Sequence, residues 1–300
     1  MQKKLVILSG PTASGKSQLA LDLAVHYQTS IVSADSRQVY KRLNIGTAKP
    51  DLQTMNLVPH YLIDILEVDA EYNVGLFVID ANKIIHELFQ KNEIVILAGG
   101  TGLYVNAVIN GLDDFPMIDP DVKSDLISIW KNEGVDILAR ELSSLDPEYA
   151  NSVDLKNPHR IIRALSVIRS SHQKYSSYLK NKSNHQDYLI LHLLIDDTRE
   201  VIYDRINRRV DHMLEMGLMD EVKSLIDYWE CPSMKTVGYS ESISFLKGEC
   251  NQEEAIEKIK QHTRNYAKRQ MTWYRKYHQG PIITRNLDEK LIQTIDDFST

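Results

Sequence analysis

The chain has 300 residues, of which 43% are apolar and 25% are charged. These are ordinary values for a globular protein with its own core, and they exclude a disordered chain. The net charge of −6 argues mildly against a nucleic-acid partner, unless basic residues cluster locally. Two cysteines are too few for a disulfide framework or a four-cysteine zinc site. No apolar run reaches the roughly 18 residues of a membrane span, so we expect a cytoplasmic protein without a membrane partner.

Strands and helices alternate in the first third of the chain. Apolar runs predict strands at residues 5–8, 31–34, 93–98 and, much later, 188–195. Helical periodicity covers residues 18–27 and 75–90. Strands separated by helices indicate an α/β fold, with a parallel sheet and helices on both faces.

Residues 113–187 have a different character, because their apolar residues recur at helical spacing. Asp119-Pro120 and Asn157-Pro158 are helix-start signals within this stretch. We therefore expect a helical insertion domain at 113–187 in a core made of residues 1–112 and 188–300. The core should end in a long helix at about 252–278.

The segment Gly10-Pro-Thr-Ala-Ser-Gly-Lys-Ser17 follows the first strand and precedes a helix. It fits the phosphate-loop pattern, so the fold class becomes a P-loop NTPase-like core. In such a loop, backbone amides and the helix N-terminus face phosphate oxygens, the lysine adds charge, and the last hydroxyl can hold Mg²⁺. In an ATPase, a later strand usually ends in an aspartate that orders Mg²⁺. Here the later strand at residues 93–98 ends in glycines instead. The loop could therefore bind a nucleoside triphosphate or a simple diphosphate.

Two further segments end strands at the edge where α/β sheets bind ligands. Asp35 is either a general base or magnesium ligand, or only a cap of its own loop. Gly99-Gly100-Thr101-Gly102 is either a tight turn or a hydroxyl placed near a phosphate.

Basic residues cluster at two places despite the negative net charge. Arg205, Arg208 and Arg209 lie on one predicted helix and could close over phosphates or form a solvated face. Residues 258–276 contain seven basic residues and no acid, interleaved with tyrosine and tryptophan. That pattern favours RNA, through phosphate neutralisation and base stacking, over a merely solvated helix.

Several other strings accompany the phosphate loop. They include Ser33-Ala-Asp-Ser-Arg-Gln-Val-Tyr40, Ile45-Gly-Thr-Ala-Lys-Pro50, Gly99-Gly-Thr-Gly-Leu-Tyr104, Asn157-Pro-His-Arg160, Val237-Gly-Tyr239 and Ala267-Lys-Arg-Gln-Met-Thr-Trp273. Together they make the chain resemble the tRNA dimethylallyltransferases along most of its length. Residues 123–154 match this family only loosely, and the zinc finger of some eukaryotic relatives is absent.

The resemblance implies transfer of a dimethylallyl group from dimethylallyl diphosphate to N6 of the adenosine 3′ to the anticodon, position 37 of tRNA. By the family pattern, Asp35 accepts the N6 proton and Thr101 lies between the two substrates. The diphosphate would bind, with Mg²⁺ on Ser17, to Gly10, Thr12, Ala13, Ser14, Gly15, Lys16, Ser17, Arg205 and Arg209.

The expected partners are dimethylallyl diphosphate and the tRNA anticodon stem-loop, and we expect a monomer. The residues expected to contact tRNA are Asp35, Ser36, Arg37, Gln38, Thr101, Lys123, His159, Arg160, Ile161, Ile162, Arg163, Lys235, Gly238, Tyr239, Lys268 and Arg269. Two alternatives stay open. A small-molecule kinase would explain the phosphate loop but not the basic helix, and a non-catalytic RNA-binding protein would explain only that helix.

Overall fold

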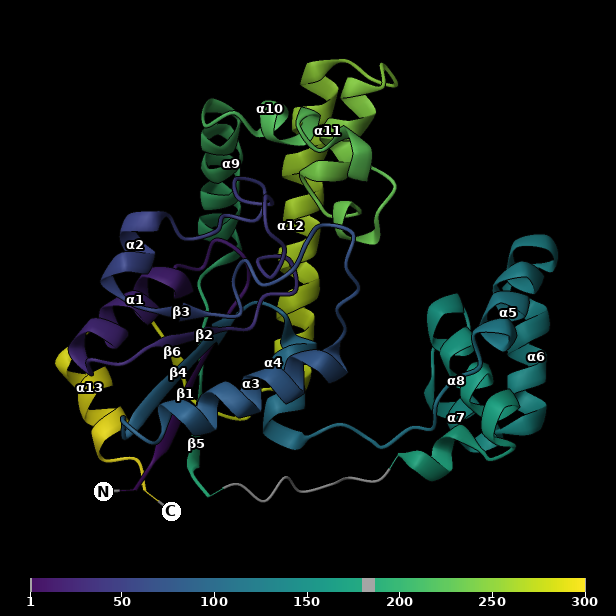
Figure 1. The fold of residues 1–300 in the computed structure, drawn as a ribbon, viewed down its shortest axis with the longest axis horizontal. Helices are drawn as coiled ribbons and strands as arrows, with labels where there is room; N and C mark the ends of the chain where they lie inside the picture. The colour runs from purple at the N-terminus through teal and green to yellow at the C-terminus, as the bar shows by residue number, and fades with distance from the viewer. Residues whose placement is uncertain (1, 180–186, 300) are drawn as a thin grey trace. The chain divides into compact units, whose positions relative to one another are not determined.

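The computed structural model describes residues 2–179 and 187–299 (Figure 1). The chain divides into two compact units, Met1–Ile109 with His185–Thr300, and Asn110–Asn184. Both boundaries lie three residues before those expected from the sequence, at 110 against 113 and at 184 against 187. We call the first unit the core and the second the insertion, and describe each by itself.

The core is built on one six-stranded parallel sheet with the strand order β3-β2-β4-β1-β5-β6. The strands are β1 (Lys4–Ser9), β2 (Ile31–Ser33), β3 (His60–Tyr61), β4 (Ile94–Gly99), β5 (Leu189–Ile195) and β6 (Ile282–Ile283). The parallel α/β class predicted from the sequence is confirmed. Because β1 lies between β4 and β5, the loop that follows it emerges at the middle of the sheet edge.

Side chains of β1 alternate between two apolar layers, as the period of a strand requires. Leu5 and Ile7 pack against α3 (Val74–Leu88) and α4 (Gly102–Asn110). Val6 and Leu8 pack against α1 (Lys16–His26) and α13 (Glu289–Asp296). Both faces of the sheet are therefore covered by helices, and the buried strands need no polar face.

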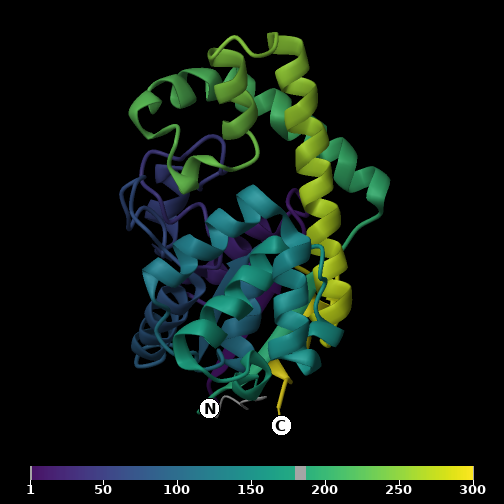
Figure 2. The ribbon, with the colours of Figure 1, turned by 90° about the vertical axis from the view of Figure 1, so that its right-hand side faces the viewer.

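A third apolar cluster in the core lies beyond the sheet and is made mainly by helices and loops. The helices of this region are α9 (Arg199–Glu215), α10 (Leu218–Lys223), α11 (Tyr239–Leu246) and α12 (Gln252–Tyr277), with short 3-10 turns at Ile226–Tyr228 and Pro232–Met234. The short helix α2 (Leu52–Leu57) has no buried residue and takes no part in this cluster. Figure 2 shows α12 running from this helical region down alongside the sheet. Its start is fixed by a capping box, in which Asn251 and Glu254 each bond the other's backbone amide.

The insertion is helical over its described residues, 110–179, with no strand among them, as predicted. It contains α5 (Pro120–Glu133), α6 (Val135–Leu145), α7 (Pro147–Ser152), α8 (Pro158–Ser171) and a 3-10 turn at Tyr175–Tyr178. Asp119 and Asn157 cap α5 and α8, each followed by proline in the first turn. The buried apolar face of α8 packs against α5 and α6 to form the core of this unit.

The sequence-based prediction missed the elements at the sheet edges and the chain end. β3 and β6 have two residues each, too few for a periodic signal, and α13 follows the helix that was expected to end the chain. Across residues 2–179 and 187–299, none of the helices combines the length and apolarity that a membrane crossing requires.

Candidate active site

The loop between β1 and α1 has the geometry of an anion-binding turn. Gly15 caps α1 with φ of 92°, and Ala13 also has a positive φ of 63°. These left-handed positions let the chain turn sharply into the helix. The cap has no side-chain hydrogen bond and the first turn of α1 has no acid. The N-terminal amides of α1 and its dipole therefore favour an anion at this place.

Two positive charges meet at this loop, Lys16 from the loop itself and Arg209 from α9, far along the chain. Lys16 Nζ donates to the Pro11 carbonyl oxygen at 3.2 Å, and Arg209 Nη1 donates to Thr12 Oγ1 at 3.1 Å. Removal of the ammonium from water lowers the pKa of Lys16 to about 8, and Arg209 adds to this while Asp35 opposes it. Burial also lowers the pKa of Arg209. Two cationic side chains held close together, although burial disfavours the charged form of each, indicate a site for an anion.

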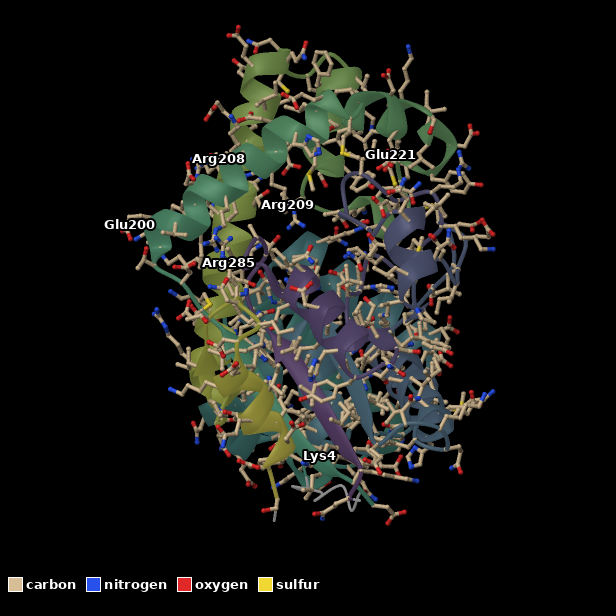
Figure 3. All side chains as sticks on the ribbon, turned by 90° about the vertical axis from the view of Figure 1, so that its left-hand side faces the viewer. Lys4, Glu200, Arg208, Arg209, Glu221 and Arg285 are labelled. Carbon is tan, nitrogen blue, oxygen red and sulfur yellow. The ribbon has the colours of Figure 1, made fainter. Side chains whose placement is uncertain are left out.

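Arg205 does not share this site, contrary to the sequence-based prediction. It lies one helical turn before Arg209 on α9, but its Nη2 pairs with Asp197 Oδ2 at 2.8 Å. It lines neither of the two cavities described below. Arg208 pairs with Asp204 on the exposed side of the same helix (Figure 3). Only one of the three arginines therefore faces the phosphate loop.

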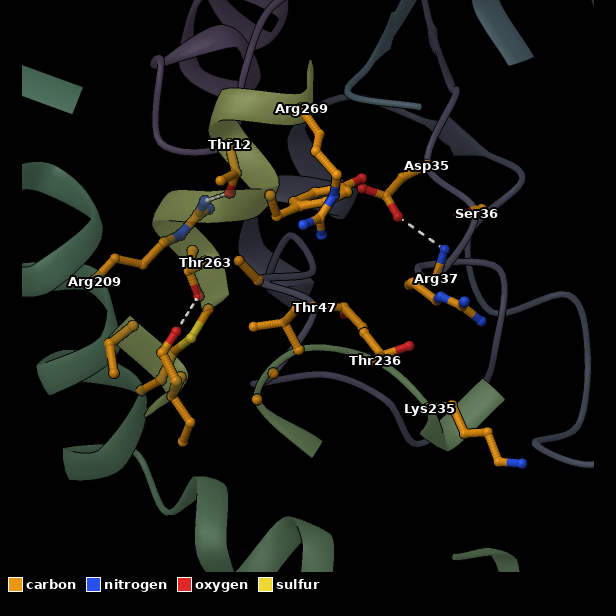
Figure 4. Close-up of a pocket in the computed structure, with 18 residues that line it drawn as sticks. Thr12, Asp35, Ser36, Arg37, Thr47, Arg209, Lys235, Thr236, Thr263 and Arg269 are labelled. Carbon is orange, nitrogen blue, oxygen red and sulfur yellow. Dashed lines mark hydrogen bonds between the residues drawn. The ribbon is translucent and has the colours of Figure 1, made fainter. Parts of the chain in front are cut away.

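Asp35 follows β2, caps its own loop and also lines the two cavities of the site. Its Oδ1 accepts the backbone N–H groups of Arg37 at 2.8 Å and of Gln38 at 3.3 Å, so the side chain shapes its own loop. Its Oδ2 receives neither of these bonds. The carboxylate also lines both cavities of the site, where it faces the cations (Figure 4).

Two cavities meet at Asp35 and Arg209. The smaller has a volume of about 70 Å³ and is the more polar; its lining includes Lys16, Ser17 and Gly100. The larger has a volume of about 290 Å³ and adds apolar side chains such as Val210 and Met213. Thr12, Asp35, Thr47, Arg209 and Tyr266 line both cavities. The arrangement offers a cationic phosphate pocket next to a wider pocket of mixed polarity, with a carboxylate at the junction.

The glycines after β4 are required by close packing. A Cβ on Gly99 would lie 2.2 Å from the Ala34 carbonyl oxygen, and one on Gly100 would lie 2.5 Å from Gln270 Nε2. Thr101 is not among the residues that line the two cavities. Its Oγ1 instead accepts the Ser36 backbone N–H at 3.1 Å, so it holds the loop that carries Asp35.

Gln270 is a site residue to which sequence reasoning assigned no role. It lies on α12 and is 7% exposed. Its Oε1 accepts the Thr12 backbone N–H at 2.8 Å and its Nε2 donates to the Gly100 carbonyl oxygen at 2.8 Å. It thereby ties the phosphate loop to the end of β4. Its place in the Ala267–Trp273 string was the available signal, but the string alone did not say what it contacts.

The expected RNA contacts in the core fall into two groups. Lys235, Gly238 and Arg269 line the larger cavity, with Ser36 and Arg37 (Figure 4). Tyr239 does not: it is fully buried and its hydroxyl donates to Glu221 Oε1 at 2.6 Å, so the prediction of an RNA contact there is wrong for the side chain.

The remaining core contacts divide similarly. Gln38 lines the smaller cavity, and its amide donates to the carbonyl oxygens of Thr47 and Ala48, which fixes that wall. Lys268 is exposed and lies at a separate pocket with Arg275.

The basic face of α12 is partly used inside the core. Lys260 pairs with Asp211 at 2.7 Å and Arg264 donates to Asn207 Oδ1 at 2.7 Å, so both fasten α12 to α9. Lys260 and Arg264 belong to the basic stretch 258–276 from which RNA binding was predicted, so part of its charge serves contacts within the core. Lys258, Lys268 and Lys276 remain exposed.

The residues of the insertion expected to bind tRNA divide by burial. Lys123, His159, Arg160 and Arg163 are exposed. Ile161 and Ile162 are 0% and 6% exposed and belong to the apolar core of this unit. Because α8 turns these two side chains away from solvent, the predicted tRNA contact of residues 159–163 depends on the exposed side chains of this segment.

The donors around the phosphate loop fit a magnesium ion held mainly through a substrate. Ser17 lines the smaller cavity with Asp35. Within residues 2–179 and 187–299 there is no group of three or more His, Cys, Asp or Glu side chains that could hold a metal. Mg²⁺ commonly keeps several waters and takes phosphate oxygens with one or two protein ligands, which this donor set permits.

The model of the protein family described as IPP transferase matches residues 38–277 of this chain. The chain belongs to the IPP transferase family. It is 43% identical over 272 residues to tRNA dimethylallyltransferase 1 of Bacteroides thetaiotaomicron, covering 91% of this chain and 88% of that protein. It is 41% identical over 308 residues to tRNA dimethylallyltransferase of Acetivibrio thermocellus, covering 98% and 96%.

Solved structures agree with this family assignment. The full-length tRNA isopentenylpyrophosphate transferase of Bacillus halodurans is similar, with a TM-score of 0.70 and 37% identity over 98% of this chain and 95% of that one. A eukaryotic dimethylallyltransferase acting on tRNA gives a TM-score of 0.81 and 25% identity over 98% and 76%. The family assignment favours a transferase over the kinase and the non-catalytic RNA-binding protein that the sequence left open.

Proposed function

We propose that the chain transfers a dimethylallyl group from dimethylallyl diphosphate to N6 of adenosine 37, beside the anticodon of tRNA. The observation that carries this proposal is that Lys16 lines the smaller cavity while Arg209 and Asp35 lie at its junction with the larger one. A diphosphate needs the cations, and an amine nucleophile needs the carboxylate. Family membership supplies the reaction that requires both.

The smaller cavity suits the diphosphate of the donor. The diphosphate is the leaving group, and its oxygens gain negative charge as the bond to the allylic carbon breaks. The amides at the start of α1, Lys16 and Arg209 are fixed in place before the reaction, so they stabilise that charge without reorganising. A Mg²⁺ ion on Ser17 and the phosphates would add further positive charge there.

The larger cavity suits the acceptor base. N6 attacks the allylic C1 carbon, a C–N bond forms, and the C1–O bond breaks with its electron pair leaving on diphosphate. Asp35 then takes the N6 proton. The adenosine must leave its stack to enter the cavity, which costs a few kcal/mol and needs offsetting contacts. Arg37, Lys235 and Arg269 line this cavity and can supply them through phosphates.

The expected partners follow from this assignment. They are dimethylallyl diphosphate and the tRNA anticodon stem-loop, and residues of one chain are sufficient to line both cavities, as a monomeric enzyme requires.

The test is incubation of the protein with Mg²⁺, labelled dimethylallyl diphosphate and unmodified tRNA, followed by nucleoside analysis. Label on N6 of adenosine 37 is expected, and a tRNA with guanosine at that position should remain unlabelled. ATP consumption with a small alcohol, and no label in RNA, would overturn the proposal in favour of a kinase.

A further inference from the structure

Glu221 lies on α10 (Figure 3). It binds two separate segments of the core. Its Oε2 accepts the backbone N–H groups of Asn44 at 3.1 Å and Ile45 at 2.8 Å. Its Oε1 accepts the Gly46 N–H at 3.2 Å and the Tyr239 hydroxyl at 2.6 Å. One carboxylate thus receives four hydrogen bonds, which use the acceptor positions that its two oxygens offer.

Three successive amides that converge on one anion form a concave cationic nest. A negative charge stabilises that conformation, because it offsets the mutual repulsion of the three N–H dipoles. The hydroxyl of Tyr239 stays a donor at physiological pH, since burial and the neighbouring Glu221 charge both raise its pKa. The contacts to Glu221 are therefore charge-assisted bonds, which are about twice as strong as neutral ones.

The two segments that Glu221 joins both contribute to the wall of the larger cavity. Gly46, Thr47 and Ala48 line the larger cavity, and so do Val237 and Gly238. The segments also touch directly: a Cβ on Gly46 would lie 2.4 Å from Cε2 of the Tyr239 ring. Glu221 itself is not among the residues that line the cavity. It acts on the cavity only through the segments that it binds.

We infer that Glu221 is a positioning residue that clamps residues 44–48 to residues 235–239 and so fixes the cavity that takes the acceptor base. This inference rests on the proposed function for the identity of the acceptor. The groups of the smaller cavity that suit an anion are the phosphate loop with Lys16, and Arg209, and none of these contacts Glu221. Of the clamped segment 44–48, Thr47 also lines the smaller cavity, but its hydroxyl donates to the carbonyl oxygens of Leu43 and Asn44. Loss of the clamp should therefore disturb the acceptor and spare the donor.

The test compares Glu221→Ala with Asp220→Ala, which removes the same charge from an exposed neighbouring position on the same helix. For Glu221→Ala we expect kcat/KM for an anticodon stem-loop RNA to fall by about 10- to 100-fold, the range that a misplacement of up to about 1 Å can cost. The Kd for dimethylallyl diphosphate should stay within about twofold of wild type, as a role limited to the acceptor requires. Asp220→Ala should match wild type in both.

Two graded variants separate positioning from simple stability. Tyr239→Phe removes one of the four bonds and should give a smaller loss. Glu221→Gln keeps an acceptor oxygen but turns an N–H₂ group toward the nest, so it should fall between wild type and Glu221→Ala. Equal losses of donor and acceptor binding, in step with melting temperature, would overturn the positioning role.

Hydrogen exchange gives a readout that does not depend on turnover. The amides of residues 44–46 should exchange faster in Glu221→Ala than in Asp220→Ala, because their acceptor is gone. Unchanged exchange would refute the clamp even in an active enzyme. Faster exchange in a protein that never labels tRNA would refute the proposed function and keep the clamp.

Discussion

Replacement of Gln270 by methionine is expected to loosen the phosphate loop. The two side chains have similar length, but methionine cannot accept the Thr12 N–H or donate to the Gly100 carbonyl. Each buried backbone group left without a partner costs about 1–3 kcal/mol. Because the loop borders a cavity that water can enter, we take the lower half of the summed range, about 2–4 kcal/mol. In a unit of this size that corresponds to a decrease in Tm of about 4–8 °C.

The assay is thermal unfolding with and without dimethylallyl diphosphate, with Gln261→Met on the exposed face of α12 as the matched control. Gln261→Met should have the same Tm as the wild-type protein. Gln270→Met should melt lower and bind the donor more weakly, since Thr12 belongs to the loop that faces the phosphates. A Gln270→Met protein that melts within a degree of its control and binds the donor equally well would refute the reasoning.

Three further predictions concern the charged groups. Asp35→Asn keeps an oxygen for the amides of Arg37 and Gln38 but cannot take a proton, so turnover should fall by about 10²–10⁴-fold at unchanged RNA affinity; normal turnover would exclude Asp35 as the base. Because the pKa of Lys16 is lowered to about 8, the ammonium is charged below that pH and neutral above it. The Kd for dimethylallyl diphosphate should therefore rise as pH increases from 7 to about 9.5, up to about tenfold per unit above pH 8, and a flat profile would contradict this assignment. Arg209→Ala should weaken donor binding about tenfold or more, whereas Arg205→Ala should change it by less than about twofold, as isothermal titration can show.

The sequence predicted the long elements of the fold and the position of the phosphate loop. Continuous apolar runs are sufficient to locate buried strands such as β1 and β4. The same information does not give the order of strands in the sheet, which depends on packing between distant segments. It also could not separate Arg205 from Arg209, because residues four apart share a helix face and only the tertiary position of Asp197 distinguishes them.

The missed features of the site share one physical cause. Gln270 and Glu221 act through hydrogen bonds to backbone groups, and a backbone acceptor or donor has no sequence signature. Tyr239 shows the opposite error: a motif residue expected to meet RNA points into the protein instead. Motifs locate a site well, but the direction of each side chain depends on the segments packed around it.

The position of β1 in the middle of the sheet affects how the chain folds during synthesis. Its neighbours are β4 and β5, so its second partner is translated only at residues 189–195. Residues 209 and 270, which complete the phosphate loop, appear later still. At roughly 5–20 residues per second, the first strand waits on the order of ten seconds or more for its second neighbour. The helices of the insertion contact one another within about 75 residues and can fold during that wait. The pocket around the phosphate loop therefore forms only when nearly the whole chain has been made, and a shorter nascent chain lacks the site that we propose for the diphosphate.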